Sequence, residues 1–182
     1  MNQTLPENAI GIIAGNGSFP LLVARAAKAS GARVCVVAFT GHIDPDPAKA
    51  LSSEADHYAE LRLGQLGKLI KHFKKQGVTR LTMAGAISKP KALRTRPDLR
   101  AIKLFFKARN RGDDNLLRLV IQELEGEGFD FFGAADLAPS LRTPQGVLTK
   151  ETPSEDEWDD LRFGASVARQ LGNLDIGQCV VV

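Results

Sequence analysis

Short apolar runs alternate with stretches of helical periodicity along most of the first 135 residues. The runs at residues 10–14, 33–39, 80–87 and 129–134 predict strands, and the second of them, RVCVVAF, is almost continuously apolar. Such runs are typical of strands that are buried on both faces of a parallel sheet. Between the runs, apolar residues recur with helical spacing, as at residues 66–73. The alternation predicts an α/β fold, a Rossmann-like and mostly parallel sheet with helices on both faces.

The pattern changes after residue 135. Residues 136–153, DLAPSLRTPQGVLTKETP, contain three prolines and one glycine, which predicts a linker. Ser154 and Glu157 then form the pattern of a capping box, which predicts a helix to about residue 171 before the strand-like run DIGQCVVV. We therefore expect a Rossmann-like N-terminal domain at residues 1–135, a linker at 136–153, and the start of a second α/β domain, cut short, at 154–182.

The loop after the first predicted strand contains Gly15 and Gly17, and a helix is expected from residue 19 onward. Backbone N–H groups in such a loop, together with the positive end of the helix, bind anions. Pro20 stands where dinucleotide-binding loops carry a third glycine, and no acid ends the second strand, so the sequence argues against NAD. Two interpretations stay open: a turn that only needs glycine, and a cradle for the phosphate of a single nucleotide.

Carboxylates follow two other predicted elements. His42, Asp44 and Asp46 come after the second strand in GHIDPD, where a metal could bind, but the prolines in this segment favour a turn and a helix cap. Asp113 and Asp114 follow a glycine at the start of a predicted helix. They are either caps that complement the helix dipole or ligands of Mg²⁺, which prefers one or two carboxylates with phosphate oxygens.

Residues 89–111 form a basic stripe with a single acid, Asp98. The stripe contains nine basic residues: Lys89, Lys91, Arg94, Arg96, Arg100, Lys103, Lys107, Arg109 and Arg111. A solvated face usually mixes signs, so an anionic partner is favoured. Nucleic-acid binders often interleave exposed aromatic residues, whereas helical spacing predicts that Phe105 and Phe106 face the core with Leu99 and Ile102. We therefore expect an anionic membrane surface as the partner, and no nucleic acid.

Several protein classes are not favoured by the sequence. No apolar run approaches the roughly 20 residues of a membrane-spanning helix, and the first residues lack the basic and apolar regions of a secretory signal. Cys35 and Cys179 both lie in strand-like apolar runs, which predicts buried thiols rather than a disulfide. These features predict a cytoplasmic protein.

Five segments occur in the order and spacing of one known family: AGNGSFPLLVARAAKASG, LGQLGKLIKHFKKQGV, MAGAISKP, RPDLRAIKLFFKARNRGDDNLLRLVIQELEGEGF and DIGQCVVV. Each segment is a weak signal alone. Together they resemble the UDP-2,3-diacylglucosamine pyrophosphatases of α-proteobacteria and some other Gram-negative bacteria, over essentially the whole chain from Ile10 onward.

The resemblance implies a Mg²⁺-dependent hydrolase of lipid A biosynthesis. Its substrate would be a UDP-linked acylated glucosamine, cleaved to 2,3-diacylglucosamine 1-phosphate (lipid X) and UMP. The family consists of two-domain proteins that act as peripheral proteins on the cytoplasmic side of the inner membrane. An acidic EGTD-like motif of the family, thought to supply the essential aspartate, does not occur in this chain, so that residue is expected beyond residue 182.

The phosphate or the UMP part of the substrate is expected to contact the loop residues Gly15, Asn16, Gly17 and Ser18. The same cleft is expected to include Gly85 and Lys89, with Gln65 and Lys68 as weaker candidates, and Asp113 and Asp114 are expected to bind Mg²⁺. The alternative to a hydrolase is a nucleotide-sugar or phospholipid-binding chain without turnover. Oligomeric state is left open, a homo-oligomer included.

Overall fold

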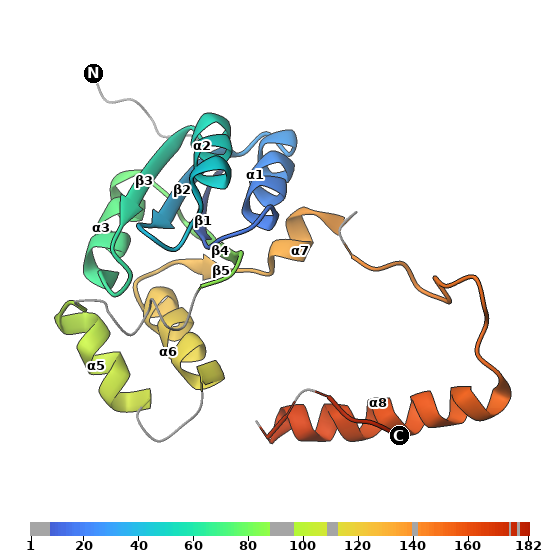
Figure 1. Ribbon diagram of the computed structural model, residues 1–182. Coiled ribbons are helices and arrows are strands. Elements are labelled where there is room, and N and C mark those ends of the chain that lie inside the picture. The colour runs from blue at the N-terminus through green and yellow to red at the C-terminus, as the bar shows by residue number, and fades with distance from the viewer. Residues whose placement is uncertain (1–7, 88–96, 109–112, 140–141, 175, 178) are drawn as a thin grey trace. The chain divides into compact units, whose positions relative to one another are not determined.

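The computed structural model describes the chain except residues 1–7, 88–96, 109–112, 140–141, 175 and 178, and the side chains of residues 108 and 113–115 (Figure 1). It forms two compact units, Met1–Arg142 and Thr143–Val182. Each unit is described by itself.

The first unit is built on a five-stranded parallel sheet. Its strands are β1 (Ala9–Ala14), β2 (Arg33–Phe39), β3 (His57–Leu61), β4 (Arg80–Ala84) and β5 (Asp130–Phe131). They lie in the order β3-β2-β1-β4-β5, and each neighbouring pair is parallel. This is the order of the doubly wound Rossmann-like sheet, which confirms the predicted fold class.

Helices cover both faces of this sheet. They are α1 (Phe19–Ala29), α2 (Pro45–Glu54), α3 (Leu66–Lys75), α5 (Leu99–Ala108), α6 (Asp113–Gly126) and the short α7 (Ala134–Leu137). Helices α3, α5 and α6 lie over one face, and α1, α2 and α7 over the other (Figure 1). Alternate residues of β2 enter the two cores, with Cys35 and Val37 in one and Val34 and Val36 in the other. The nearly continuous apolar run of β2 therefore has the predicted cause, burial on both faces.

Two strands are shorter than the sequence predicts. The run at residues 80–87 is a strand only to Ala84, because Gly85 then turns the chain with a φ of 91°. The predicted strand at residues 129–134 shortens to Asp130–Phe131, and α7 begins at Ala134. Both strands end early because the chain turns away at the carboxyl edge of the sheet.

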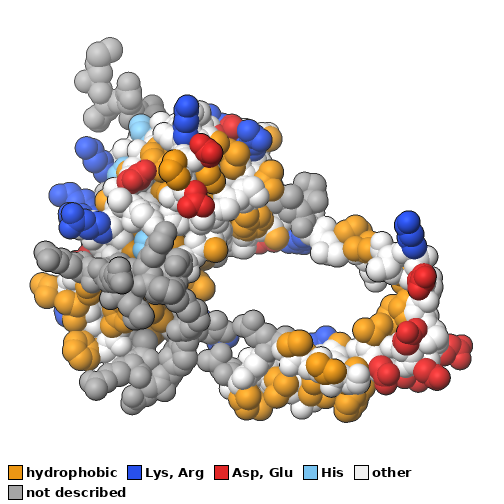
Figure 2. Space-filling view, viewed as in Figure 1, with side chains coloured by type: hydrophobic (Ala, Val, Ile, Leu, Met, Phe, Trp, Pro, Cys, Tyr) orange, Lys and Arg blue, Asp and Glu red, His pale blue; other side chains and the backbone are white. Residues whose placement is uncertain are grey.

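The prediction for the apolar face of α5 is wrong. The buried side chains of α5 are Ala101 and Leu104, whereas Leu99, Phe105 and Phe106 are 78%, 49% and 69% exposed. Hydrophobic side chains accordingly gather on the surface over α5 (Figure 2). Apolar residues occupy more of the circumference of α5 than the small contact with α3 and α6 can bury. Because Phe105 and Phe106 are exposed, they no longer speak against nucleic acid as a partner.

The second unit contains α8 (Glu155–Asn173), and the end of the chain at Val182 lies against this helix. The predicted capping box is confirmed, because Ser154 Oγ accepts the Glu157 N–H at 3.3 Å and Glu157 Oε2 accepts the Ser154 N–H at 2.8 Å. Gly164 is buried, and a Cβ there would lie 3.4 Å from the side chain of Val182. The strand predicted for DIGQCVVV is not formed in the described residues, because nothing in this unit pairs with it. Cys179 is consequently exposed and not buried, while Cys35 is buried as predicted.

No helix in the described part of the chain is both long enough and apolar enough to cross a membrane.

Candidate functional site

The carboxyl edge of the sheet between β1 and β4 is where the strand order reverses. In open α/β sheets, ligands bind at such a switch point, outside the carboxyl ends of the strands. Residues 15–18, which we call the glycine loop, leave β1 at this edge and lead into α1. The segment that begins with Gly85 leaves β4 beside it. Gly85 therefore lies beside the glycine loop.

Backbone hydrogen bonds join these two segments. The Asn16 N–H donates to Ala86 O at 2.8 Å, the Ala86 N–H donates to Asn16 O at 3.0 Å, and the Gly15 N–H donates to Ala84 O at 2.8 Å. A Cβ at Gly15 would lie 2.5 Å from Ala86 O, and a Cβ at Gly85 would lie 2.7 Å from Asn16 O. Both positions need glycine because two backbones approach closely here. Gly15 and Gly85 therefore shape the edge through the backbone.

Beyond this contact, the glycine loop opens toward solvent. Gly17 has a φ of 99° and no atom within 4 Å of a Cβ built on it. Ser18 is the N-cap residue of α1, and its side chain accepts no capping hydrogen bond. Pro20 lies in the first turn of α1, as predicted, where a missing N–H costs no helical hydrogen bond. The N-terminus of α1, with its partial positive charge, is thus left without an acid in its first turn.

The Asn16 side chain reaches the start of α2. Asn16 Nδ2 donates to Asp44 Oδ2 at 2.8 Å, and the Asp44 N–H donates to Asn16 Oδ1 at 3.0 Å. Asp44 is the N-cap residue of α2, as the sequence predicts, although its carboxylate does not cap that helix. No local sequence signal indicates this pairing, because 28 residues separate the partners.

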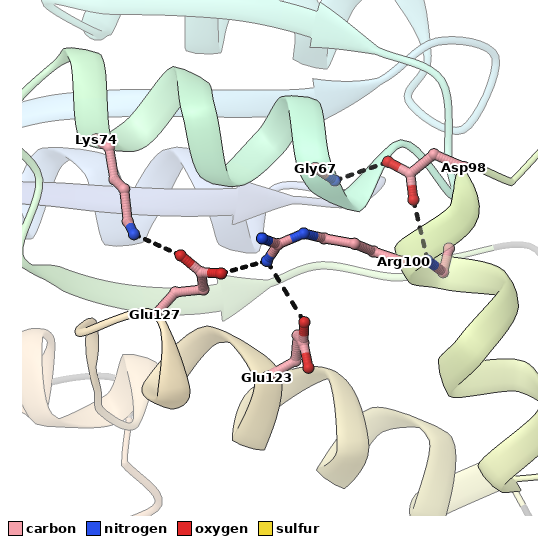
Figure 3. A network of polar contacts seen from close by, with 7 residues as sticks. Gly67, Lys74, Asp98, Arg100, Glu123 and Glu127 are labelled. Carbon is pink, nitrogen blue, oxygen red and sulfur yellow. Dashed lines mark hydrogen bonds and ion pairs between the residues drawn. The ribbon is translucent and has the colours of Figure 1, made fainter.

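The N-terminus of α3 differs from that of α1, because an acid already occupies it. Asp98 Oδ2 accepts the Gly67 N–H at 2.7 Å, and Asp98 Oδ1 accepts the Ala101 N–H at the start of α5 at 2.9 Å (Figure 3). The Asp98 N–H donates to Gly64 O at 2.9 Å. One carboxylate therefore caps two helices. In the sequence, Asp98 could have been identified as a cap by its position, because it is the only acid of the stripe and directly precedes α5.

The two weaker candidates lie beside this capped N-terminus. Gln65 is the N-cap residue of α3, and its Oε1 accepts the Arg62 N–H at 3.2 Å. Lys68 is exposed in the first turn of α3. Because Asp98 already holds the Gly67 N–H, this helix end offers less to a substrate anion than the α1 N-terminus.

One cation of the basic stripe is neutralised by acids of α6 and its end. Arg100 forms ion pairs with Glu127 and, at 3.5 Å, with Glu123, while Lys74 of α3 also pairs with Glu127 (Figure 3). The hydrogen bonds from Lys74 and then from Arg100 lower the pKa of Glu127 to about 2. This network fastens α3, α5 and α6 to one another. In the described stripe, Lys103 and Lys107 remain as exposed lysines on α5.

Three predicted site residues cannot be placed by their side chains. Lys89 lies outside the described residues, and Asp113 and Asp114 begin α6 but their side chains are outside the description. Within the described residues, no group of three or more His, Cys, Asp or Glu side chains could hold a metal ion. His42 is buried at the end of β2. The metal interpretation of the GHIDPD segment gains no support from the described side chains.

Comparison with known proteins matches this chain in two consecutive parts. The family model described as the LpxI N-terminal domain matches residues 9–141, and the LpxI C-terminal domain matches residues 144–182. The chain belongs to the LpxI family. The glycine loop, Gly85, Asp98 and the start of α6 all lie in the part that matches the LpxI N-terminal domain.

A curated member of the LpxI family shares 34% identity with the chain over 178 residues. It is the UDP-2,3-diacylglucosamine pyrophosphatase LpxI of Caulobacter vibrioides, and the alignment covers 95% of this chain and 61% of that protein. The chain thus spans about three fifths of the length of this relative. A solved structure, the ADP complex of purK, N5-carboxyaminoimidazole ribonucleotide synthetase, aligns at 19% identity with a TM-score of 0.37, over 92% of this chain and 47% of that one. A likeness at that level carries no argument.

Proposed function

We propose that this LpxI-family chain takes part in the hydrolysis of UDP-2,3-diacylglucosamine to 2,3-diacylglucosamine 1-phosphate and UMP, a step of lipid A biosynthesis. The Caulobacter relative is named for this pyrophosphatase activity. The observation that carries the proposal is the glycine loop, which opens to solvent at the switch point of the sheet and leads into the N-terminus of α1. The Ser18 side chain does not cap this helix end, and its first turn contains no acid. Such an N-terminus binds phosphate through its backbone N–H groups and its dipole.

Cleaving a pyrophosphate requires that negative charge on the phosphoryl oxygens is stabilised and that a water is oriented. The N–H groups of Gly17 and Ser18 would hold a phosphate of the UMP half, and the lysine candidates Lys89 and Lys68 would add positive charge. Gln65 would contribute a neutral hydrogen-bonding group at the neighbouring helix end. The chain thereby binds and orients the UMP part of the substrate.

Mg²⁺ is the proposed cofactor. Asp113 and Asp114 would bind it, and two carboxylates suit this ion because it retains several waters and takes phosphate oxygens as further ligands. When bound, the ion would neutralise charge on the phosphoryl oxygens. In a full-length enzyme of the family, replacing both residues by alanine should abolish Mg²⁺-dependent UMP release. Replacement of Glu125, an exposed acid near the other end of α6, is the matched control. Unchanged release in the double variant would refute the metal role.

The binding step is tested by calorimetric titration of the 182-residue chain with UMP and, separately, with uridine. A phosphate cradle requires that UMP binds clearly more tightly than uridine, because only UMP carries the phosphate. Equal affinities would refute the cradle and leave the interpretation that the glycines only serve a turn.

Turnover is tested by incubating the chain with UDP-2,3-diacylglucosamine and Mg²⁺ and measuring UMP. Release of UMP supports the hydrolase. Binding of the substrate without release supports the alternative, a nucleotide-sugar-binding chain with no activity of its own.

The proposed location is the cytoplasmic surface of the inner membrane, with the basic stripe toward anionic lipid. Phe105 and Phe106 are exposed on α5 beside Lys103 and Lys107, a combination that suits the boundary between headgroups and acyl chains. Co-sedimentation with phosphatidylglycerol vesicles should exceed that with phosphatidylcholine vesicles and should fall in the double variant Lys103→Glu, Lys107→Glu. Equal sedimentation with both lipids would exclude this surface, and binding to single-stranded DNA of mixed sequence in the same assay would favour nucleic acid instead.

A further inference from the structure

The glycine loop is attached to the fold on two sides. On one side its backbone pairs with Ala86, which follows β4. On the other side the Asn16 side chain makes two hydrogen bonds to Asp44. The second attachment joins the loop after β1 to the segment that begins α2, so it links the ends of two neighbouring strands.

The orientation of the Asn16 amide follows from its two partners. Its Nδ2 faces a carboxylate oxygen, which only accepts, and its Oδ1 faces a backbone N–H, which only donates. The reverse orientation would lose both hydrogen bonds. Asp44 is exposed and Asn16 is half-buried, and Asp44 offers its side chain to Asn16 although it occupies the N-cap position of α2. The pair therefore replaces a local helix cap by a contact across the edge of the sheet.

Gly17 follows directly, has a φ of 99°, and has no described atom within 4 Å of a Cβ built on it, apart from its chain neighbours. Since glycine adopts many backbone conformations, the directions of the N–H groups of Gly17 and Ser18 depend on how the preceding residue is held. We propose that Asn16 and Asp44 are a positioning pair, which holds the glycine loop in the conformation that binds the phosphate of the nucleotide. This proposal rests on the proposed function. In this proposal the Asn16 side chain holds the loop and does not contact the ligand.

A reciprocal exchange tests the pair. In the single variant Asn16→Asp, two carboxylates face each other, and the loop is pushed away from α2. In the double variant Asn16→Asp, Asp44→Asn, the new carboxylate accepts both the N–H of residue 44 and its side-chain amide, so the full hydrogen-bond pattern returns. We expect the single variant to bind UMP about tenfold more weakly, and the double variant to bind within about twofold of the original chain.

The single variant Asp44→Asn separates positioning from direct contact with the ligand. An asparagine at position 44 still accepts the Asn16 amide through its Oδ1, so a positioning pair predicts nearly unchanged UMP affinity. If the carboxylate itself contacted the nucleotide, this variant would lose affinity as strongly as Asp44→Ala, and the proposal would be overturned. Asp46→Asn is the matched control, because it removes the same charge from an exposed residue two positions further along α2.

Loop order is read separately from affinity. The ¹H–¹⁵N heteronuclear NOE of Gly17 and Ser18 should fall in Asn16→Asp and recover in the double variant, while the melting temperature of both variants stays close to that of the original chain. If the pair only stabilised the fold, the melting temperature would fall together with the heteronuclear NOE of the loop. If the original chain does not bind UMP, the proposed function fails. If it binds UMP and Asn16→Asp binds equally well, the positioning pair fails and the proposed function stands.

Discussion

Helices α1 and α3 both begin at the carboxyl edge of the same parallel sheet, one after β1 and one after β3, yet their N-termini differ. At α3 the Asp98 carboxylate accepts the Gly67 N–H, whereas at α1 the Ser18 side chain accepts nothing and no acid lies in the first turn. Among the described side chains, an acid thus satisfies the N-terminus of α3 and none caps that of α1, where an external anion can bind. Helix N-termini of one sheet are therefore not equivalent candidates for a phosphate site. What distinguishes them is whether an acid from elsewhere in the chain has taken the N–H groups.

Removing the acid at α3 should give the largest effect. Asp98→Ala leaves the N–H groups of Gly67 and Ala101 without their acceptor, and we expect the free energy of unfolding to fall by about 2 kcal/mol in urea titrations. Asp98→Asn keeps one acceptor oxygen and should lose roughly half as much. Inorganic phosphate should then raise the melting temperature of Asp98→Ala more than that of the original chain, because α3 now resembles α1. An unfolding free energy within about 0.5 kcal/mol of the original would show that Asp98 does not close this helix end.

Placing an acid at α1 is the reverse experiment and should give an intermediate effect. Ser18→Asp puts a carboxylate at the N-terminus of α1, where it competes with the phosphate of UMP, and affinity should fall at least about tenfold. The melting temperature should stay the same or rise, since an acid at a helix N-terminus contributes about 0.3–1 kcal/mol. Ser18→Asn is the uncharged control and should retain most of the affinity. An equal loss of UMP affinity in Ser18→Asp and Ser18→Asn would indicate that the Ser18 hydroxyl, and not the charge at the helix end, determines binding.

The smallest effect concerns the network that holds α5 against α3. Glu127 has a pKa of about 2, below the ordinary value of 4.5, because Lys74 and Arg100 donate to it. A lowered pKa stabilises the fold above pH 4.5, and this contribution is lost as the pH falls toward 2. Glu127→Gln should therefore melt at a lower temperature than the original chain at pH 7, and the difference should shrink toward zero near pH 2. A difference that is independent of pH would show that the charge of Glu127 does not matter.

Local signals predicted much of the first unit. The start of α1 and the bounds of β2 agree with the sequence, since the glycine loop before α1 and the apolar run of β2 are both encoded within a few residues. The capping box of α8 was likewise visible in four consecutive residues. The two hydrogen-bonded pairs at the starts of α1 and α3 could not be predicted from the sequence. Asn16 with Asp44 and Asp98 with Gly67 are 28 and 31 residues apart, and only the folded sheet brings them together.

The orientation of α5 also escaped prediction, for a different reason. Its apolar residues extend around much of the helix, so periodicity alone does not say which of them the fold buries. The fold buries Ala101 and Leu104, the smaller strip that faces α3 and α6, and leaves both phenylalanines outside. Amphipathic spacing identifies a helix more reliably than it identifies the neighbour of that helix.

The close approach of Gly15 and Gly85 has a consequence for how this edge can change by mutation. A side chain at either position would collide with the backbone that carries the other segment, at 2.5 Å from Ala86 O or 2.7 Å from Asn16 O. The two positions therefore behave as one steric unit although 70 residues separate them. In a saturation mutagenesis of the chain, we expect near-complete intolerance of any side chain at both positions, and no substitution at one of them that rescues the other.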